Sequence, residues 1–154
     1  MARKFQNFKQ GIYSPKHKEK LLNKQKIVIY RSKLELDVMR ICDDNPYIEE
    51  WSSEAVIIPY YNTLKQKNSR YFVDLYVKFK DGKKYLFEIK PEKQMKCVTE
   101  GIKQTKNQKM STKLYTAEMT QMNKDKWLAA LAWAKQHGMT FYIITERTIQ
   151  ILKS

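Results

Sequence analysis

The stretch 71–91, YFVDLYVKFKDGKKYLFEIKP, decides the fold. Two runs of strand-forming residues flank Asp81-Gly82, a dipeptide typical of the turn in a β-hairpin. The strands are interrupted by three charged residues: Asp74, Glu88 and Lys90. They either belong to a solvated face or carry chemistry, and the register of the two strands decides which of them meet.

Two loop lengths are compatible with this turn. A two-residue loop pairs Lys80 with Lys83 and places charged side chains among apolar ones. A three-residue loop with Gly82 in the left-handed conformation pairs Phe79 with Lys83 instead and gathers the apolar side chains on one face. The residues of that face are Tyr71, Val73, Leu75, Val77, Phe79, Tyr85, Phe87 and Ile89. Because a charge placed in a core costs several kcal/mol, we expect the three-residue loop.

This register places Asp74 directly opposite Glu88, with Lys90 two residues farther along the same face. Opposed carboxylates repel unless one takes up a proton or a cation lies between them. Hard oxygen ligands favour Mg²⁺ or Mn²⁺ over zinc. A lysine beside such a cation can orient water or steady the charge on a phosphate. The pattern predicts a phosphodiesterase site; the alternative is a solvated face whose acids are offset by Lys84 and Lys90.

The 154-residue chain is long enough for one domain with a core. Its formal net charge of +14 predicts an anionic partner, with nucleic acid as the leading candidate. No apolar run approaches the ~20 residues of a membrane span, and no secretion signal is present. We therefore expect an intracellular protein without a membrane partner. The two cysteines, Cys42 and Cys97, suggest neither a disulfide framework nor a zinc site.

Charge is distributed unevenly along the chain. Residues 1–31 contain nine Lys or Arg and one acid, whereas residues 32–74 contain eight acids and five bases. We divide the chain into a basic N-terminal arm over 1–26 and a single nuclease domain over 27–154. The aromatic residues of the arm either stack on bases or anchor it to the domain.

The segment after Ser32 predicts a helix, because Leu34, Val38 and Ile41 form one stripe and Asn45-Pro46 ends it. Glu35 follows Ser32 by three residues, the spacing of a capping box, in which its carboxylate would accept from the Ser32 backbone N–H. On spacing alone, Glu35 is equally a structural residue and a functional one.

The remaining elements follow from periodicity and turn signals. We expect a strand over 54–60, a polar loop, the hairpin, and a Lys-rich helix from Pro91 to about Met110. A helix over 123–137 has one apolar face, with Gly138 just past its end. The residues of that face are Trp127, Leu128, Leu131 and Ala134. A strand over 139–146 completes the order α-β-β-β-α-β, a mixed α/β (α+β) layer.

At this point the residues resemble a known family. Asp74 followed by Glu88-Ile89-Lys90 has the form of the PD-(D/E)xK nuclease motif, with Val73 in place of its proline. The segments RSKLE, EAVIIPY, RYFVDLYV and LFEIKP are similar to the N-terminal domain of TnsA transposon endonucleases. Among chains of this size, the similarity extends to the head completion nucleases of T-even-type tailed phages. It covers roughly residues 30–91.

The resemblance implies a restriction-endonuclease-like fold, a mixed central sheet with helices on its faces. Its catalytic residues would be Glu35, Asp74, Glu88 and Lys90. Asp74, Glu88 and the Ile89 carbonyl would hold Mg²⁺, or alternatively Mn²⁺. Backbone contacts to DNA, with little sequence preference, would come from Arg3, Lys4, Lys9, Lys16, Lys78, Lys84, Lys93 and Lys96.

The resemblance also implies a role in phage assembly: cleavage of packaged DNA before heads join tails. Head, portal or neck proteins would then be partners, and the place of action would be the host cytoplasm during assembly or the virion. Two alternatives stay open: a TnsA-like transposase endonuclease subunit, and a non-catalytic basic DNA-binding protein of the virion.

Overall fold

The computed structural model describes residues 10–25, 27–99 and 110–153. Of residues 96–99 and 110–116 it describes the backbone alone. Within these ranges no helix is both long and apolar enough to cross a membrane.

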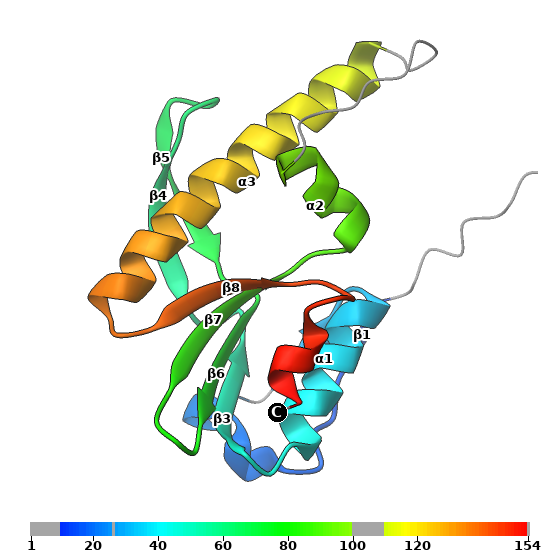
Figure 1. Cartoon of the computed structure of the whole chain (residues 1–154), viewed down its shortest axis with the longest axis vertical. Helices are drawn as coiled ribbons and strands as arrows, with labels where there is room; N and C mark the ends of the chain where they lie inside the picture. Colours follow the sequence, from blue (N-terminus) through cyan, green and yellow to red (C-terminus); the bar gives the residue numbers. More distant parts are fainter. Residues whose placement is uncertain (1–9, 26, 100–109, 154) are drawn as a thin grey trace, which may run out of the picture.

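A four-stranded mixed sheet forms the centre of the molecule (Figure 1). Its order is β3-β6-β7-β8: β6 is antiparallel to both β3 and β7, and β8 is parallel to β7. The bounds are Ile48–Ser53 for β3, Leu75–Phe79 for β6, Lys84–Ile89 for β7 and Thr140–Ile144 for β8. A parallel neighbour requires a crossover, and the chain between β7 and β8 supplies it with two helices, α2 (Glu92–Thr99) and α3 (Met110–Gln136).

The turn between β6 and β7 confirms the predicted three-residue loop. Leu75 pairs with Phe87, and the Phe79 N–H donates to the Lys83 carbonyl at 2.9 Å. Gly82 has φ = +90°, a left-handed conformation that glycine adopts without a Cβ penalty. The hydrophobic pattern thus selected the correct register.

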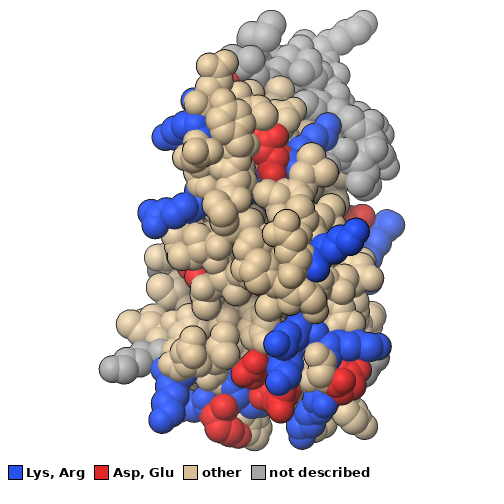
Figure 2. Space-filling model, turned by 90° about the vertical axis from the view of Figure 1, so that its left-hand side faces the viewer, with Lys and Arg blue, Asp and Glu red and all other residues tan. Residues whose placement is uncertain are grey.

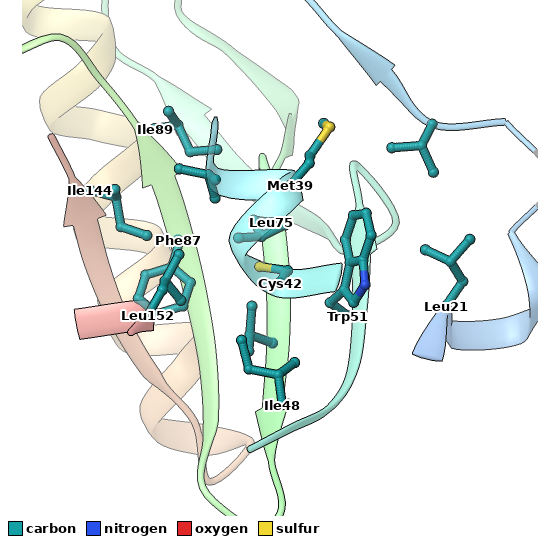
Figure 3. Close-up of a cluster of buried hydrophobic side chains, with 13 residues drawn as sticks. Leu21, Met39, Cys42, Ile48, Trp51, Leu75, Phe87, Ile89, Ile144 and Leu152 are labelled. Atoms are coloured by element: carbon teal, nitrogen blue, oxygen red, sulfur yellow. The ribbon is translucent and has the colours of Figure 1, made fainter. Parts of the chain in front are cut away.

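Both faces of the sheet are covered. The helix α1 (Lys33–Asp44) packs on one face, and the resulting core includes Met39, Cys42, Trp51, Leu75 and Phe87 (Figure 3). The helix α3 covers the other face, where a second core forms from Tyr76 and Leu86 of the sheet and side chains of the helix. The sheet is therefore the middle layer between helices.

The buried face of α3 differs from the predicted one. Trp127 and Ala134 are buried as expected, but Leu128 and Leu131 are 68% and 52% exposed, and Ala130 takes their place in the core. A small residue there lets the helix lie close to the sheet. Past the end of the helix, Gly138 has φ = +68° as predicted.

The first strand of the central sheet was not predicted. Its sequence, IEEWSS, lacks a regular alternation, although Ile48 and Trp51 are fully buried. The strand expected over 54–60 instead begins later, as β4 (Ile57–Asn62), and belongs to a separate two-stranded sheet with β5 (Lys67–Phe72). Part of the predicted polar loop is therefore β5.

The run 71–79 was expected to be one strand, but it is broken at Val73 and Asp74. Before the break the chain pairs with β4, and after it with β3 and β7. As a result Tyr71 and Val73 pack in the core under α3, and Leu75 in the core under α1, so the predicted single apolar face is wrong at these two positions.

Residues 10–25 lie against the domain. The short strands β1 (Gly11–Ile12) and β2 (Ile29–Tyr30) pair, and Leu21 is buried. The Lys20 ammonium donates to the carbonyls of Cys42, Asp43 and Asn45, which the end of α1 leaves without helical partners. The described residues also form the 3₁₀ turns η1 (Lys18–Lys20), η2 (Leu22–Lys24) and η3 (Ile149–Leu152).

Candidate active site

Asp74 and the end of β7 meet at one edge of the central sheet. A carboxylate oxygen of Asp74 accepts a hydrogen bond from the Ile89 N–H at 2.8 Å. Lys90 Nζ lies 3.6 Å from Glu88 Oε1, and the side chains of Lys90 and Glu88 are only 17% and 9% exposed. The structure therefore brings together the three charged residues that interrupt the hairpin.

The electrostatics of Asp74 reflect the neighbouring acids. Burial, followed by the charge of Glu88, raises the pKa of Asp74 to about 8, although the hydrogen bond from the Ile89 N–H lowers it. Glu35 contributes a smaller rise to the same pKa. At neutral pH Asp74 thus keeps its proton, because two ionised acids would repel, and a cation bound between them can take the place of that proton.

Glu35 lies in the first turn of α1 and caps it in a different way from the predicted one. The Ser32 hydroxyl accepts from the Glu35 N–H at 3.1 Å, but the Glu35 carboxylate accepts from the Arg31 N–H at 2.8 Å, not from Ser32. Burial raises the pKa of Glu35, and the charges of Glu54 and Glu88 add to this rise. Glu35 therefore has a capping role, and its charge also interacts with the charges of Asp74 and Glu88.

Tyr71 is a site residue that the sequence reasoning missed. Its hydroxyl donates to the Glu88 carboxylate, and burial together with the charge of Glu88 raises its own pKa. Strand alternation assigned Tyr71 to the apolar face. The break at Asp74 turns it toward Glu88 instead, and nothing in the spacing indicated that break.

Glu54 and Arg31 also border the site. They form an ion pair, and the Glu54 N–H donates to the Asp74 carbonyl at 3.2 Å. Glu54 has φ = +54°, a left-handed conformation that is rare for a residue with a side chain and typical of functional sites. Neither residue was predicted as part of the site.

The donors of this site fit a hard divalent cation better than a soft one. Asp74 and Glu88 supply carboxylate oxygens, and the contacts of the described side chains include no sulfur or imidazole beside them. Among the residues that the structure describes, no group of three or more His, Cys, Asp or Glu side chains is arranged to hold a metal ion. Mg²⁺ needs fewer, because one or two carboxylates with water and substrate phosphate suffice for it.

The predicted DNA-binding lysines are spread over the molecule. Lys78 and Lys84 pair across the strands near the turn, at the opposite end of β6 and β7 from Asp74 and Glu88. The Lys78 ammonium forms an ion pair with Glu49 at 2.9 Å. Lys16 lies near the end of α1, 3.6 Å from Asp44, while Lys93 is exposed on α2, just after Lys90. Outside the described parts lie Arg3, Lys4, Lys9 and the side chain of Lys96.

Comparisons with known proteins identify one family and one relative of this chain. A model of TnsA-like endonuclease N-terminal domains matches residues 45–146, a span that contains Asp74, Glu88 and Lys90 but begins after Glu35. The head completion nuclease of Enterobacteria phage T4 is 33% identical over 144 residues, which is 92% of this chain and 94% of the phage protein. No solved structure matches the chain significantly. The family model covers more than half of the chain, and the match to the phage nuclease covers almost all of it. The chain therefore belongs to the TnsA-like endonuclease N-terminal domain family, a family of nucleases.

Proposed function

We propose that this nuclease hydrolyses DNA phosphodiester bonds with the help of Mg²⁺, or Mn²⁺, and with little sequence preference. The observation that carries the proposal is the meeting of Asp74, Glu88 and Lys90, with the pKa of Asp74 raised to about 8. Neighbouring acids that cannot both ionise without a counter-charge are suited to a divalent cation, and without one they are unsuited to a DNA substrate.

In this mechanism Asp74, Glu88 and the Ile89 carbonyl would hold the cation. The bound ion would lower the pKa of a water molecule and offset charge on the scissile phosphate. Lys90 holds the attacking water in line through its ammonium protons and stabilises the negative charge that develops on the phosphate. Tyr71 fixes the orientation of the Glu88 carboxylate, and Glu35 supports the water or the cation from the start of α1.

The proposal is tested by the nicking of supercoiled plasmid in Mg²⁺. Lys90→Arg keeps the charge but changes the geometry, and Glu88→Gln keeps the shape but removes a ligand charge, so each should lose at least about 100-fold in rate. Lys83→Arg, in the exposed turn, is the matched control and should cleave at the wild-type rate. If Lys90→Arg, Glu88→Gln and wild type nick equally, and EDTA has no effect, the nuclease site is elsewhere.

We further propose that the protein acts on packaged DNA before phage heads join tails, with head, portal or neck proteins as partners. This role would place it in the host cytoplasm during assembly or on the virion. The similarity to the head completion nuclease of phage T4 along almost the whole chain supports it. The test uses phage heads made without this protein. If they join tails after wild-type protein is added and do not join tails after Lys90→Arg is added, the result supports the role in phage assembly.

The second candidate is a transposase endonuclease subunit, because the matching family is named for TnsA. The genes beside the encoding gene separate the two roles. Capsid and tail genes there support the phage role, whereas genes for a partner transposase support the alternative.

A further inference from the structure

The outer face of the β4–β5 hairpin is apolar and exposed. Strand alternation puts three large side chains on it, and each keeps about half of its surface accessible: Ile57 (43%), Phe72 (45%) and Tyr61 (54%). Ile57 pairs with Phe72 across the strands. The Arg70 guanidinium carbon lies 5.6 Å from the centre of the Phe72 ring. The face thus presents aromatic rings with a cation beside one of them.

The inner face of the hairpin holds it in place. Ile58, Tyr60 and Tyr71 are buried in the core under α3. Near the tip, the N–H and the hydroxyl of Thr63 donate to the carboxylate of Asp125 in α3, at 3.0 and 2.8 Å. The exposed rings are therefore carried by an anchored element and have no counterpart within the described fold to cover them.

The charge of the hairpin points to the kind of partner. Residues 57–72 contain two lysines and one arginine, and no acid. Figure 2 shows the side of the molecule on which the hairpin lies: uncharged side chains form a broad area with separate Lys and Arg and a few acids among and around them, and charges of both signs gather at the lower end. Aromatic rings accompanied by cations, without acids, are the combination that binds nucleic acid strands, because rings stack on bases while cations contact phosphates.

The hairpin begins beside the carboxylates. Phe72 precedes Asp74 by two residues, so their Cα atoms are at most about 7 Å apart. A DNA strand advances about 3.4 Å per nucleotide. The Cα of Phe72 therefore lies within the length of about two nucleotides of the Cα of Asp74, and the strands extend about 20 Å farther from there.

We infer that the outer face of the β4–β5 hairpin binds the DNA strand next to the cleaved bond by stacking on its bases. The enzyme then favours DNA whose bases are unpaired at that point, such as a fork, a frayed end or a single strand, because paired bases in a duplex do not expose their faces. This inference rests on the proposed nuclease function and names its substrate class.

The test compares binding of a fluorescent single strand, a fork and a blunt duplex by anisotropy in EDTA. Cleavage of the same DNAs is then followed in Mg²⁺. Phe72→Ala should bind the single strand and the fork about 5- to 100-fold more weakly and the duplex almost unchanged. Phe72→Trp should retain the preference, and Phe72→Leu, which keeps the apolar bulk, should lose it. Tyr142→Ala is the control, because Tyr142 has similar exposure (48%) but lies on β8.

Three results would overturn the inference. The first is a Phe72→Ala variant, folded by circular dichroism, whose fork-to-duplex ratio in binding and cleavage equals that of wild type. The second is a Phe72→Leu variant that behaves as wild type. The third is a Phe72→Ala variant that differs from wild type only in its sedimentation, which would assign the face to apolar contact with a second copy. Failure of the nuclease proposal is distinct, since wild-type protein would then bind the fork and cleave no DNA in Mg²⁺.

Discussion

The Asp74 carboxylate and the Ile89 backbone N–H are joined by a hydrogen bond of 2.8 Å. Ile89 separates Glu88 from Lys90, so this bond ties the chain break before β6 to the end of β7. Asparagine keeps an oxygen acceptor for the same N–H but carries no charge. The charge of Asp74 can therefore be removed while the geometry is retained.

Asp74→Asn should abolish DNA cleavage and yet stabilise the metal-free protein at high pH. Since the pKa of Asp74 is about 8 in the folded state and near 4 when unfolded, wild-type stability falls between pH 4 and 8, and the loss is complete above pH 8. We expect the variant to be more stable by about 1–3 kcal/mol at pH 9 and by little at pH 4. Denaturant unfolding in EDTA across this range measures the difference. A constant difference would contradict the raised pKa.

Binding of Mg²⁺ should depend on pH in the same window. Because Asp74 must lose its proton to hold a cation, affinity should rise by up to about tenfold per pH unit between pH 6 and 8 and level off above. Calorimetric titration without DNA measures the affinity, and buffers of different ionisation enthalpy report the released proton. Glu88→Gln serves as the comparison and should bind weakly at every pH. An affinity that does not change with pH would rule out Asp74 as the titrating ligand.

Tyr71→Phe should lower kcat by about 10- to 100-fold, the usual effect of losing a group that orients a metal ligand. KM for DNA should change little, because the ring remains in the core. Tyr76→Phe is the matched control: it removes a hydroxyl in the same core that donates to Glu50 at 3.0 Å. Equal rates for the two variants would show that the bond to Glu88 has no part in catalysis.

The two roles of Glu35 can be separated at the start of α1. Ser32→Ala removes the hydroxyl that accepts from the Glu35 N–H and should cost about 1 kcal/mol of stability with cleavage retained. Glu35→Gln keeps an acceptor for the Arg31 N–H but removes the charge, so it should unfold like wild type and cleave at least about tenfold more slowly. Full activity in Glu35→Gln would leave only the capping role.

The centre of the fold was accessible from the sequence because its signals are local. The apolar pattern of the hairpin selects one register, Gly82 supplies the turn, and Ser32 and Asn45 bound α1. The strand β3 was missed, since Glu49 and Glu50 interrupt it and its burial depends on tertiary contacts of Ile48 and Trp51. Propensity carries no information about such contacts.

The candidate site was only partly accessible. Pairing across the hairpin places Asp74 near Glu88 from register alone, and Lys90 follows from alternation. Tyr71 and Glu54 reach the site because the chain breaks at Val73 and Asp74 and because Glu54 takes a left-handed conformation. The break and the left-handed conformation are properties of the backbone. Neither Tyr71 nor Glu54 has a local sequence signal that predicts them.

That break makes Asp74 the corner at which the two sheets meet. One continuous run of chain leaves the two-stranded sheet at Phe72 and enters the central sheet at Leu75. Hydrogen bonds hold the corner on both sides, because the Asp74 carboxylate accepts from the Ile89 N–H and the Asp74 carbonyl accepts from the Glu54 N–H. A substitution at Asp74 therefore changes the joint between the two sheets as well as the carboxylate.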